Sequence, residues 1–133
     1  MPGDNAKKAL IDSLNGLLAD YFTLYLKTKN YHWHVAGPQF RDLHLLFDEQ
    51  SAELFALTDI IAERVRKNGG STLTSIGAIA GKSSIKDDDR PKVDAMDMVK
   101  AIRAVKEAAT EGMADDWTDQ AEQRAWFLTQ IAS

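Results

Sequence analysis

The chain has 133 residues, of which 44% are hydrophobic, and its formal net charge at pH 7 is −4. This length and composition predict a single globular domain spanning residues 1–133. The absence of cysteine excludes disulfides and thiolate metal sites. The negative net charge argues against a protein whose whole surface binds nucleic acid.

The first predicted element is a long amphipathic helix from about residue 5 to Val35. Its apolar positions recur at alternating three- and four-residue steps, which is the spacing of one helix face. These positions are Leu10, Leu14, Leu17, Tyr21, Leu24 and Tyr31, with Thr28 in the one gap. The dipeptide Gly37-Pro38 is typical of a helix end followed by a restart. A second helix is therefore predicted from about Pro38 to Lys67, where Asn68-Gly69-Gly70 ends it.

The rest of the chain predicts a long crossover followed by two shorter helices. Residues 68–94 contain scattered Gly, Ser and Lys, and an apolar patch of Leu73, Ile76 and Ile79 predicts one short helix within them. Apolar residues at helical spacing predict a third helix over residues 97–111 and a fourth over residues 116–131. Two hairpins joined by a long crossover predict an all-α, ferritin-like four-helix bundle whose second hairpin is shortened.

The second predicted helix carries four ligand-type side chains at helical spacing. His44 and Asp48 are four residues apart, as are Asp59 and Glu63. At 100° per residue the four fall within about a 100° sector beside the apolar face. Eleven residues at a 1.5 Å rise separate Asp48 from Asp59 by about 16 Å, whereas metal–ligand bonds are about 2.0–2.2 Å long. One chain therefore cannot bring both pairs to one ion.

The two pairs can meet across a two-fold axis. If two copies pack antiparallel through this face, His44 and Asp48 of one subunit lie opposite Asp59 and Glu63 of the other. His32, near the end of the first helix, is brought beside His44 by a tight turn. Two imidazoles and three carboxylates suit one or two Fe²⁺ ions. These ligand types do not exclude Zn²⁺ or Mn²⁺ as the bound metal. The alternative is a structural helical bundle in which the ligand-type side chains of the second helix form only a polar interface.

Three segments in the first half of the chain carry a family resemblance. They are Lys29–Phe40, with its His-Trp dipeptide and Gly-Pro turn, Leu43–Asp48, and Asp59–Arg64. Together they closely resemble the Dps (DNA protection during starvation) family of the ferritin superfamily.

The resemblance implies a metal and catalytic site shared between subunits. His32, His44 and Asp48 would be iron ligands from one subunit, and Asp59 and Glu63 ligands from its two-fold partner. It also implies a hollow homododecamer that oxidises Fe²⁺, preferentially with hydrogen peroxide, and stores a ferric mineral. The family's Trp at the position of Trp33 lies near the iron.

Two features depart from the family pattern. Lys7 and Lys8 are the only basic residues expected before the first helix, whereas DNA-coating members carry longer basic tails, so we expect weak binding to duplex DNA. The third and fourth helices look half as long as the first two, which reduces the acidic stretch that lines the iron pore. Asp115, Asp116 and Asp119 are candidates to replace it, although an acidic helix start explains at least two of them.

These observations predict an iron-storing oxidoreductase of the ferroxidase type. A DNA-coating nucleoid protein is the alternative from the binding class. The Glu-x-x-His motif of larger ferritins is absent. No apolar run approaches the roughly 18 residues of a membrane span, and the N-terminal residues have no apolar stretch long enough for a signal peptide. A cytoplasmic protein without a membrane partner is therefore expected.

Overall fold

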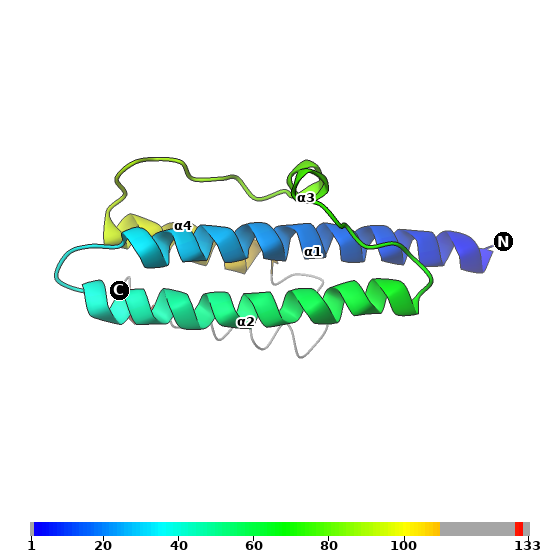
Figure 1. Cartoon of the computed structure of the whole chain (residues 1–133), viewed down its shortest axis with the longest axis horizontal. Helices are drawn as coiled ribbons and strands as arrows, with labels where there is room; N and C mark the ends of the chain where they lie inside the picture. The colour runs from blue at the N-terminus through cyan, green and yellow to red at the C-terminus, as the bar shows by residue number, and fades with distance from the viewer. Residues whose placement is uncertain (1, 110–129, 132–133) are drawn as a thin grey trace. The chain divides into compact units, whose positions relative to one another are not determined.

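The computed structural model describes residues 2–109 and 130–131. It defines four α-helices, which are α1 (Pro2–His34), α2 (Phe40–Lys67), α3 (Ile76–Lys82) and α4 (Ala95–Ala109) (Figure 1). The described residues contain no strand, in agreement with the all-α prediction. None of the helices in this part of the chain is long and apolar enough to cross a membrane.

The first two helices have nearly the predicted bounds. α1 begins at Pro2, a favoured first-turn residue, so Lys7 and Lys8 lie on the exposed surface of the helix and not before it as predicted. The weak DNA binding expected from them stays a prediction. α2 begins at Phe40 and not at Pro38, because Gly37 takes the left-handed φ of 104° and its carbonyl accepts the Phe40 N–H at 3.0 Å.

The short crossover helix and the third bundle helix are also present. The Ser75 hydroxyl caps α3 by accepting the Ala78 N–H at 3.1 Å. α4 has 15 residues, the predicted length, and begins two residues earlier than predicted. The predicted fourth helix lies outside the described residues except for positions 130 and 131, which are helical, and Asp115, Asp116 and Asp119 lie outside them too.

The chain divides into two compact units, and α1 and α2 each contribute one part to each unit. Unit 1 comprises residues 1–26 and 52–87, and unit 2 comprises residues 27–51 and 88–133. The prediction of a single domain stays a prediction.

In unit 1 the first part of α1 packs against the last part of α2 and against the crossover. The buried apolar residues are Leu14, Leu18, Ala19, Tyr21, Leu24, Leu54, Leu57, Ile61 and Val65. Asn15 donates its side-chain N–H to the Ser71 carbonyl at 2.9 Å, and Asp20 accepts the Ser84 N–H at 2.7 Å. These bonds hold both ends of the crossover segment around α3 against α1.

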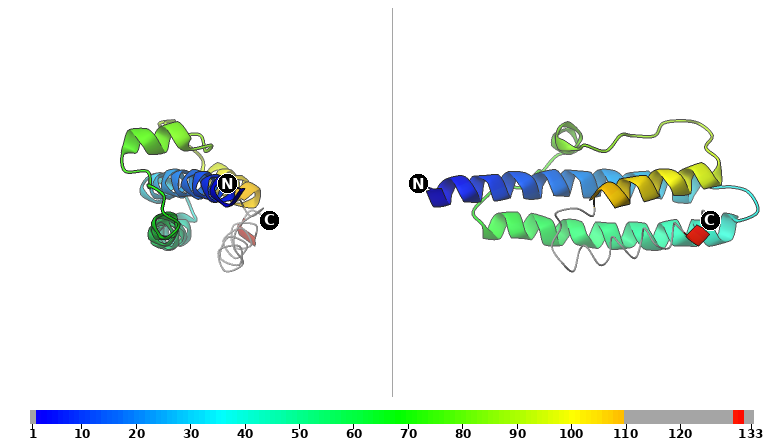
Figure 2. Two further views of the ribbon diagram at one scale, coloured as in Figure 1. Left: turned by 90° about the vertical axis from the view of Figure 1, so that its right-hand side faces the viewer. Right: turned by 180° about the vertical axis from the view of Figure 1, so that it is seen from behind.

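In unit 2 the last part of α1 packs against the first part of α2, and α4 lies beside α1 (Figure 2). The buried apolar residues are Tyr31, Val35, Leu43, Phe47, Met98, Val99 and Ile102. Asp88, at the end of the crossover, accepts the Tyr31 hydroxyl and a two-pronged bond from the Arg90 guanidinium at 2.8 and 2.7 Å. Arg90 holds the pKa of Asp88 well below its usual range, and burial raises the pKa of Tyr31.

Candidate metal centre

His32 and His44 contact each other from α1 and α2 within unit 2. Their rings stack with centroids 3.9 Å apart and an interplanar angle of 19°. His32 Nδ1 lies 2.6 Å from the His44 carbonyl oxygen, and His44 Nδ1 lies 2.7 Å from the His32 carbonyl oxygen. Because a carbonyl oxygen only accepts, both Nδ1 atoms carry a proton and donate it. In each neutral ring Nε2 therefore keeps its lone pair, which is the donor that a metal ion requires.

This reciprocal pairing orients both imidazoles through hydrogen bonds within the protein. A histidine that binds a metal usually donates its other ring N–H to a carbonyl or carboxylate, which fixes the tautomer and the ring orientation. Here each ring donates its Nδ1–H to the backbone carbonyl of the other histidine. The Phe40 ring also stacks against His44, with centroids 4.9 Å apart. The turn between α1 and α2 thus positions two Nε2 atoms that keep their lone pairs.

Asp48 lies one helical turn beyond His44 and next to His32. Its Oδ1 atom is 3.8 Å from His32 Nε2, and the same oxygen accepts a hydrogen bond from Lys29 Nζ at 2.6 Å. The bond from Lys29 lowers the pKa of Asp48, so the carboxylate is charged near neutral pH. The side chain of Asp48 is 51% exposed, whereas that of His32 is 14% exposed. Solvent ions can therefore reach the carboxylate.

We call His32, His44 and Asp48 the half-site. Asp59 and Glu63, the other two predicted ligands, lie on α2 in unit 1, and both are exposed. Among residues 2–109 and 130–131, no three histidine or acidic side chains converge closely enough to hold a metal ion by themselves. His32 thus contacts two of the predicted ligands, and Asp59 and Glu63 are not part of that group.

Lys29 is the residue of this site that the sequence reasoning missed. It precedes His32 by three residues, a spacing that places both on one side of α1. That spacing was the available signal, but a lysine at a helix surface is usually solvated. Its contact with Asp48 becomes visible only when α1 and α2 are packed together.

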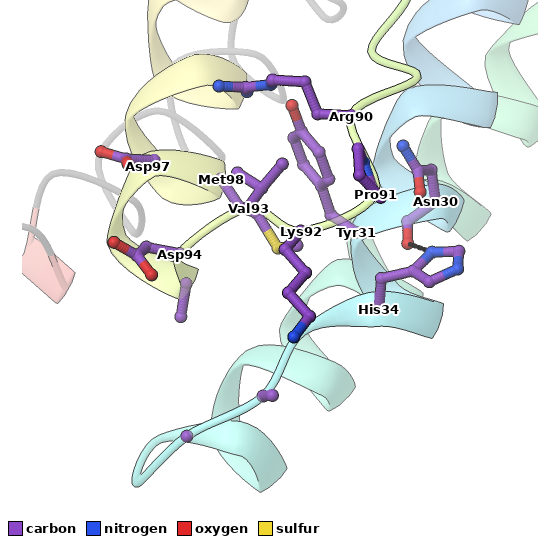
Figure 3. Close-up of a pocket in the computed structure, with 13 residues that line it drawn as sticks. Asn30, Tyr31, His34, Arg90, Pro91, Lys92, Val93, Asp94, Asp97 and Met98 are labelled. Atoms are coloured by element: carbon purple, nitrogen blue, oxygen red, sulfur yellow. Dashed lines mark hydrogen bonds between the residues drawn. The ribbon is translucent and has the colours of Figure 1, made fainter.

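Unit 2 also holds a cavity of about 650 Å³ between the end of α1, residues 90–94 and the start of α4 (Figure 3). His34, which the sequence left without a role, lines it and donates Nδ1–H to the Asn30 carbonyl at 2.8 Å. None of the five predicted ligands lines this cavity. It is therefore separate from the half-site.

Comparisons with known proteins agree on one family. Residues 11–133 match the ferritin-like domain. An uncharacterized low temperature-induced protein of Nostoc sp. is 35% identical over 94% of this chain and 80% of its own length. A DNA protection during starvation protein of Brevibacillus brevis is 34% identical over 77% of this chain and 74% of its own. The X-ray structure of Dps from Thermosynechococcus elongatus is similar, with a TM-score of 0.92 and 25% identity, over 100% of this chain and 96% of that chain.

Proposed function

The chain belongs to the Dps family of ferritin-like proteins, and on this premise we propose that it oxidises Fe²⁺ and stores the ferric product inside a hollow oligomer. The observation that carries the proposal is the pair of imidazoles whose Nδ1 atoms both donate to a backbone carbonyl, which leaves each Nε2 with its lone pair. Such pairing supplies two oriented nitrogen donors beside a charged carboxylate.

Fe²⁺ is the proposed substrate of this site. Two imidazoles with carboxylates suit a borderline ion that must also keep a position open for its oxidant. The same donors accept Zn²⁺ and Mn²⁺, so the choice of iron rests on the family and not on the ligand types alone.

Asp59 and Glu63 of a two-fold partner complete the site in this proposal. α2 is one continuous helix from Phe40 to Lys67, so the two pairs of ligand-type residues stay at different levels of the same helix. The exposure of Asp48, Asp59 and Glu63 in the single chain supports their use in an interface with a second copy. Assembly of such dimers into a homododecamer follows the family pattern.

Hydrogen peroxide is the proposed oxidant. Two Fe²⁺ ions each give one electron to one peroxide molecule, the O–O bond breaks, and two protons are taken up to form two waters. The carboxylates hold the ferric product, for which oxygen donors are well suited. Because the two electrons pass to one peroxide in a fixed site, this route does not form hydroxyl radical. Trp33, which is exposed in the single chain, stands next to His32 and can intercept any oxidant that escapes.

Removal of both imidazoles tests the proposal. In the assembled protein with His32→Ala and His44→Ala, we expect the initial rate of Fe²⁺ oxidation by peroxide to fall by about 100-fold, because both nitrogen donors are lost. The rate is measured by stopped-flow absorbance of the ferric product. His34→Ala is the matched control, because this third histidine lies outside the half-site, and it should keep the wild-type rate. A double variant as fast as wild type would exclude this site.

A further inference from the structure

The ammonium of Lys29 occupies the carboxylate oxygen that faces His32. Lys29 Nζ lies 2.6 Å from Asp48 Oδ1, and His32 Nε2 lies 3.8 Å from the same atom. An ion with bonds of about 2.0–2.2 Å to each ligand can bridge such a separation between nitrogen and oxygen. The metal ion and the Lys29 ammonium would then bind the same carboxylate oxygen.

We propose that Lys29 competes with Fe²⁺ for Asp48 and so lowers the affinity of the half-site for the ion; this inference rests on the proposed function. The ammonium and the metal are both cations, and they repel each other when they share one carboxylate oxygen. When Fe²⁺ takes the place of the ammonium on Oδ1, the Lys29 hydrogen bond breaks. The ammonium thus holds the place on Oδ1 that the metal ion would take.

The surroundings of the ion pair allow this exchange. The Lys29 side chain is 24% exposed and that of Asp48 is 51% exposed, so water can solvate the ammonium when it leaves. Lysine carries its charge on a flexible four-carbon stem, so the ammonium can move away from Oδ1. Ion pairs that reach solvent are individually weak, so a divalent ion can displace one.

If Lys29 only positions Asp48, removal of Lys29 should change the metal affinity in the opposite direction. If the ammonium only held Asp48 in the right rotamer, its removal would free the carboxylate to rotate, and metal binding would weaken. If the ammonium competes, its removal strengthens binding. The direction of the change in metal affinity therefore separates the two roles, which a loss of stability alone would not.

The experiment measures binding of Co²⁺, which peroxide-free solution leaves in the divalent state, to the assembled full-length protein by calorimetry and visible absorption. For Lys29→Met we expect binding about tenfold tighter than wild type, since one charge-assisted hydrogen bond no longer has to break. Lys29→Arg keeps a cation at this position and should bind no more tightly than wild type. Lys100→Met, an exposed lysine of α4, makes the same charge change away from Asp48 and should leave the affinity unchanged.

Unchanged or weaker binding by Lys29→Met, with the variant still assembled, would overturn the proposal. Asp48→Ala separates this failure from failure of the proposed function. If Asp48→Ala binds Co²⁺ as wild type does, the half-site itself is wrong. If Asp48→Ala abolishes binding while Lys29→Met leaves it unchanged, only the competition by Lys29 is excluded.

Discussion

At the scale of single residues, the half-site and the hydrogen bonds of Asp88 have one feature in common, because in both partly buried polar groups bind one another. His32 and His44 exchange hydrogen bonds to backbone carbonyls. Asp88 collects the Tyr31 hydroxyl and the Arg90 guanidinium, and its side chain is only 6% exposed. A buried carboxylate is tolerated when it is paired and hydrogen-bonded. The histidine pair thus joins α1 to α2, and the bond from Tyr31 to Asp88 joins α1 to the crossover.

The pKa of Asp88 gives the stability of the protein a pH dependence. Because Arg90 and Tyr31 lower this pKa in the folded state, Asp88 contributes stability above the ordinary aspartate pKa of about 4, and this contribution is lost as the pH falls through the folded value. We expect Asp88→Asn to lower the free energy of unfolding at pH 7 by about 1–3 kcal/mol.

The difference in unfolding free energy between wild type and Asp88→Asn should narrow as the pH falls below about 4, because the wild-type carboxyl is then protonated in the unfolded state while the folded state still holds it charged. Denaturant unfolding from pH 7 down to pH 3, at one protein concentration, measures it. Asp89→Asn, at the exposed neighbouring position, is the control and should show no comparable gap. If the difference in unfolding free energy between wild type and Asp88→Asn stayed constant with pH, the charge of Asp88 would not be its cause.

At the scale of elements, the close crossing of the crossover over α1 depends on Gly70. A Cβ placed there would lie 2.7 Å from Ile11 Cγ2 and within 3 Å of two further atoms of that side chain. We expect Gly70→Ala to destabilise the protein by about 1–3 kcal/mol, because Ile11 or the crossover must move. Thermal and denaturant unfolding provide the measurement.

Gly77 offers a matched control for this substitution. It lies inside α3, where an added Cβ would meet nothing within 4 Å. Gly77→Ala should therefore be neutral or stabilise by up to about 1 kcal/mol, as alanine does in an open helical position. If both variants behaved alike, the contact with Ile11 would not be the reason for glycine at position 70.

The elements themselves were predictable because their signals are local. The three- and four-residue spacing of apolar side chains and the Gly37-Pro38 turn predicted α1 and α2 within a few residues. The contact between His32 and His44 followed from the tight turn that joins their helices. The other contacts between elements were not predictable, because they depend on how each helix is rotated against its neighbour. Tyr31 and Asp88 are 57 residues apart, and no spacing rule connects them. The hydrogen bond from Lys29 to Asp48 could not be predicted for the same reason.

At the scale of the whole molecule, the question is whether one chain or two build each site. The half-site offers only one carboxylate, Asp48, and the described part of the chain holds no complete metal-binding group. Asp59 and Glu63 are eleven or more residues further along the same helix, which is about 16 Å or more along its axis. A shared site predicts that lesions in different halves can complement each other.

Mixed assemblies test this prediction. In a heterodimer of a His44→Ala subunit with an Asp59→Ala subunit, one of the two sites collects both lesions and the other collects none. Roughly half of the wild-type rate of Fe²⁺ oxidation should therefore return in verified heterodimers, because one of the two symmetric sites is then intact. The two variants assembled separately and then mixed should stay inactive, which controls for additive residual activity. If each chain built its own complete site, every site in the heterodimer would carry one lesion and the rate would stay low.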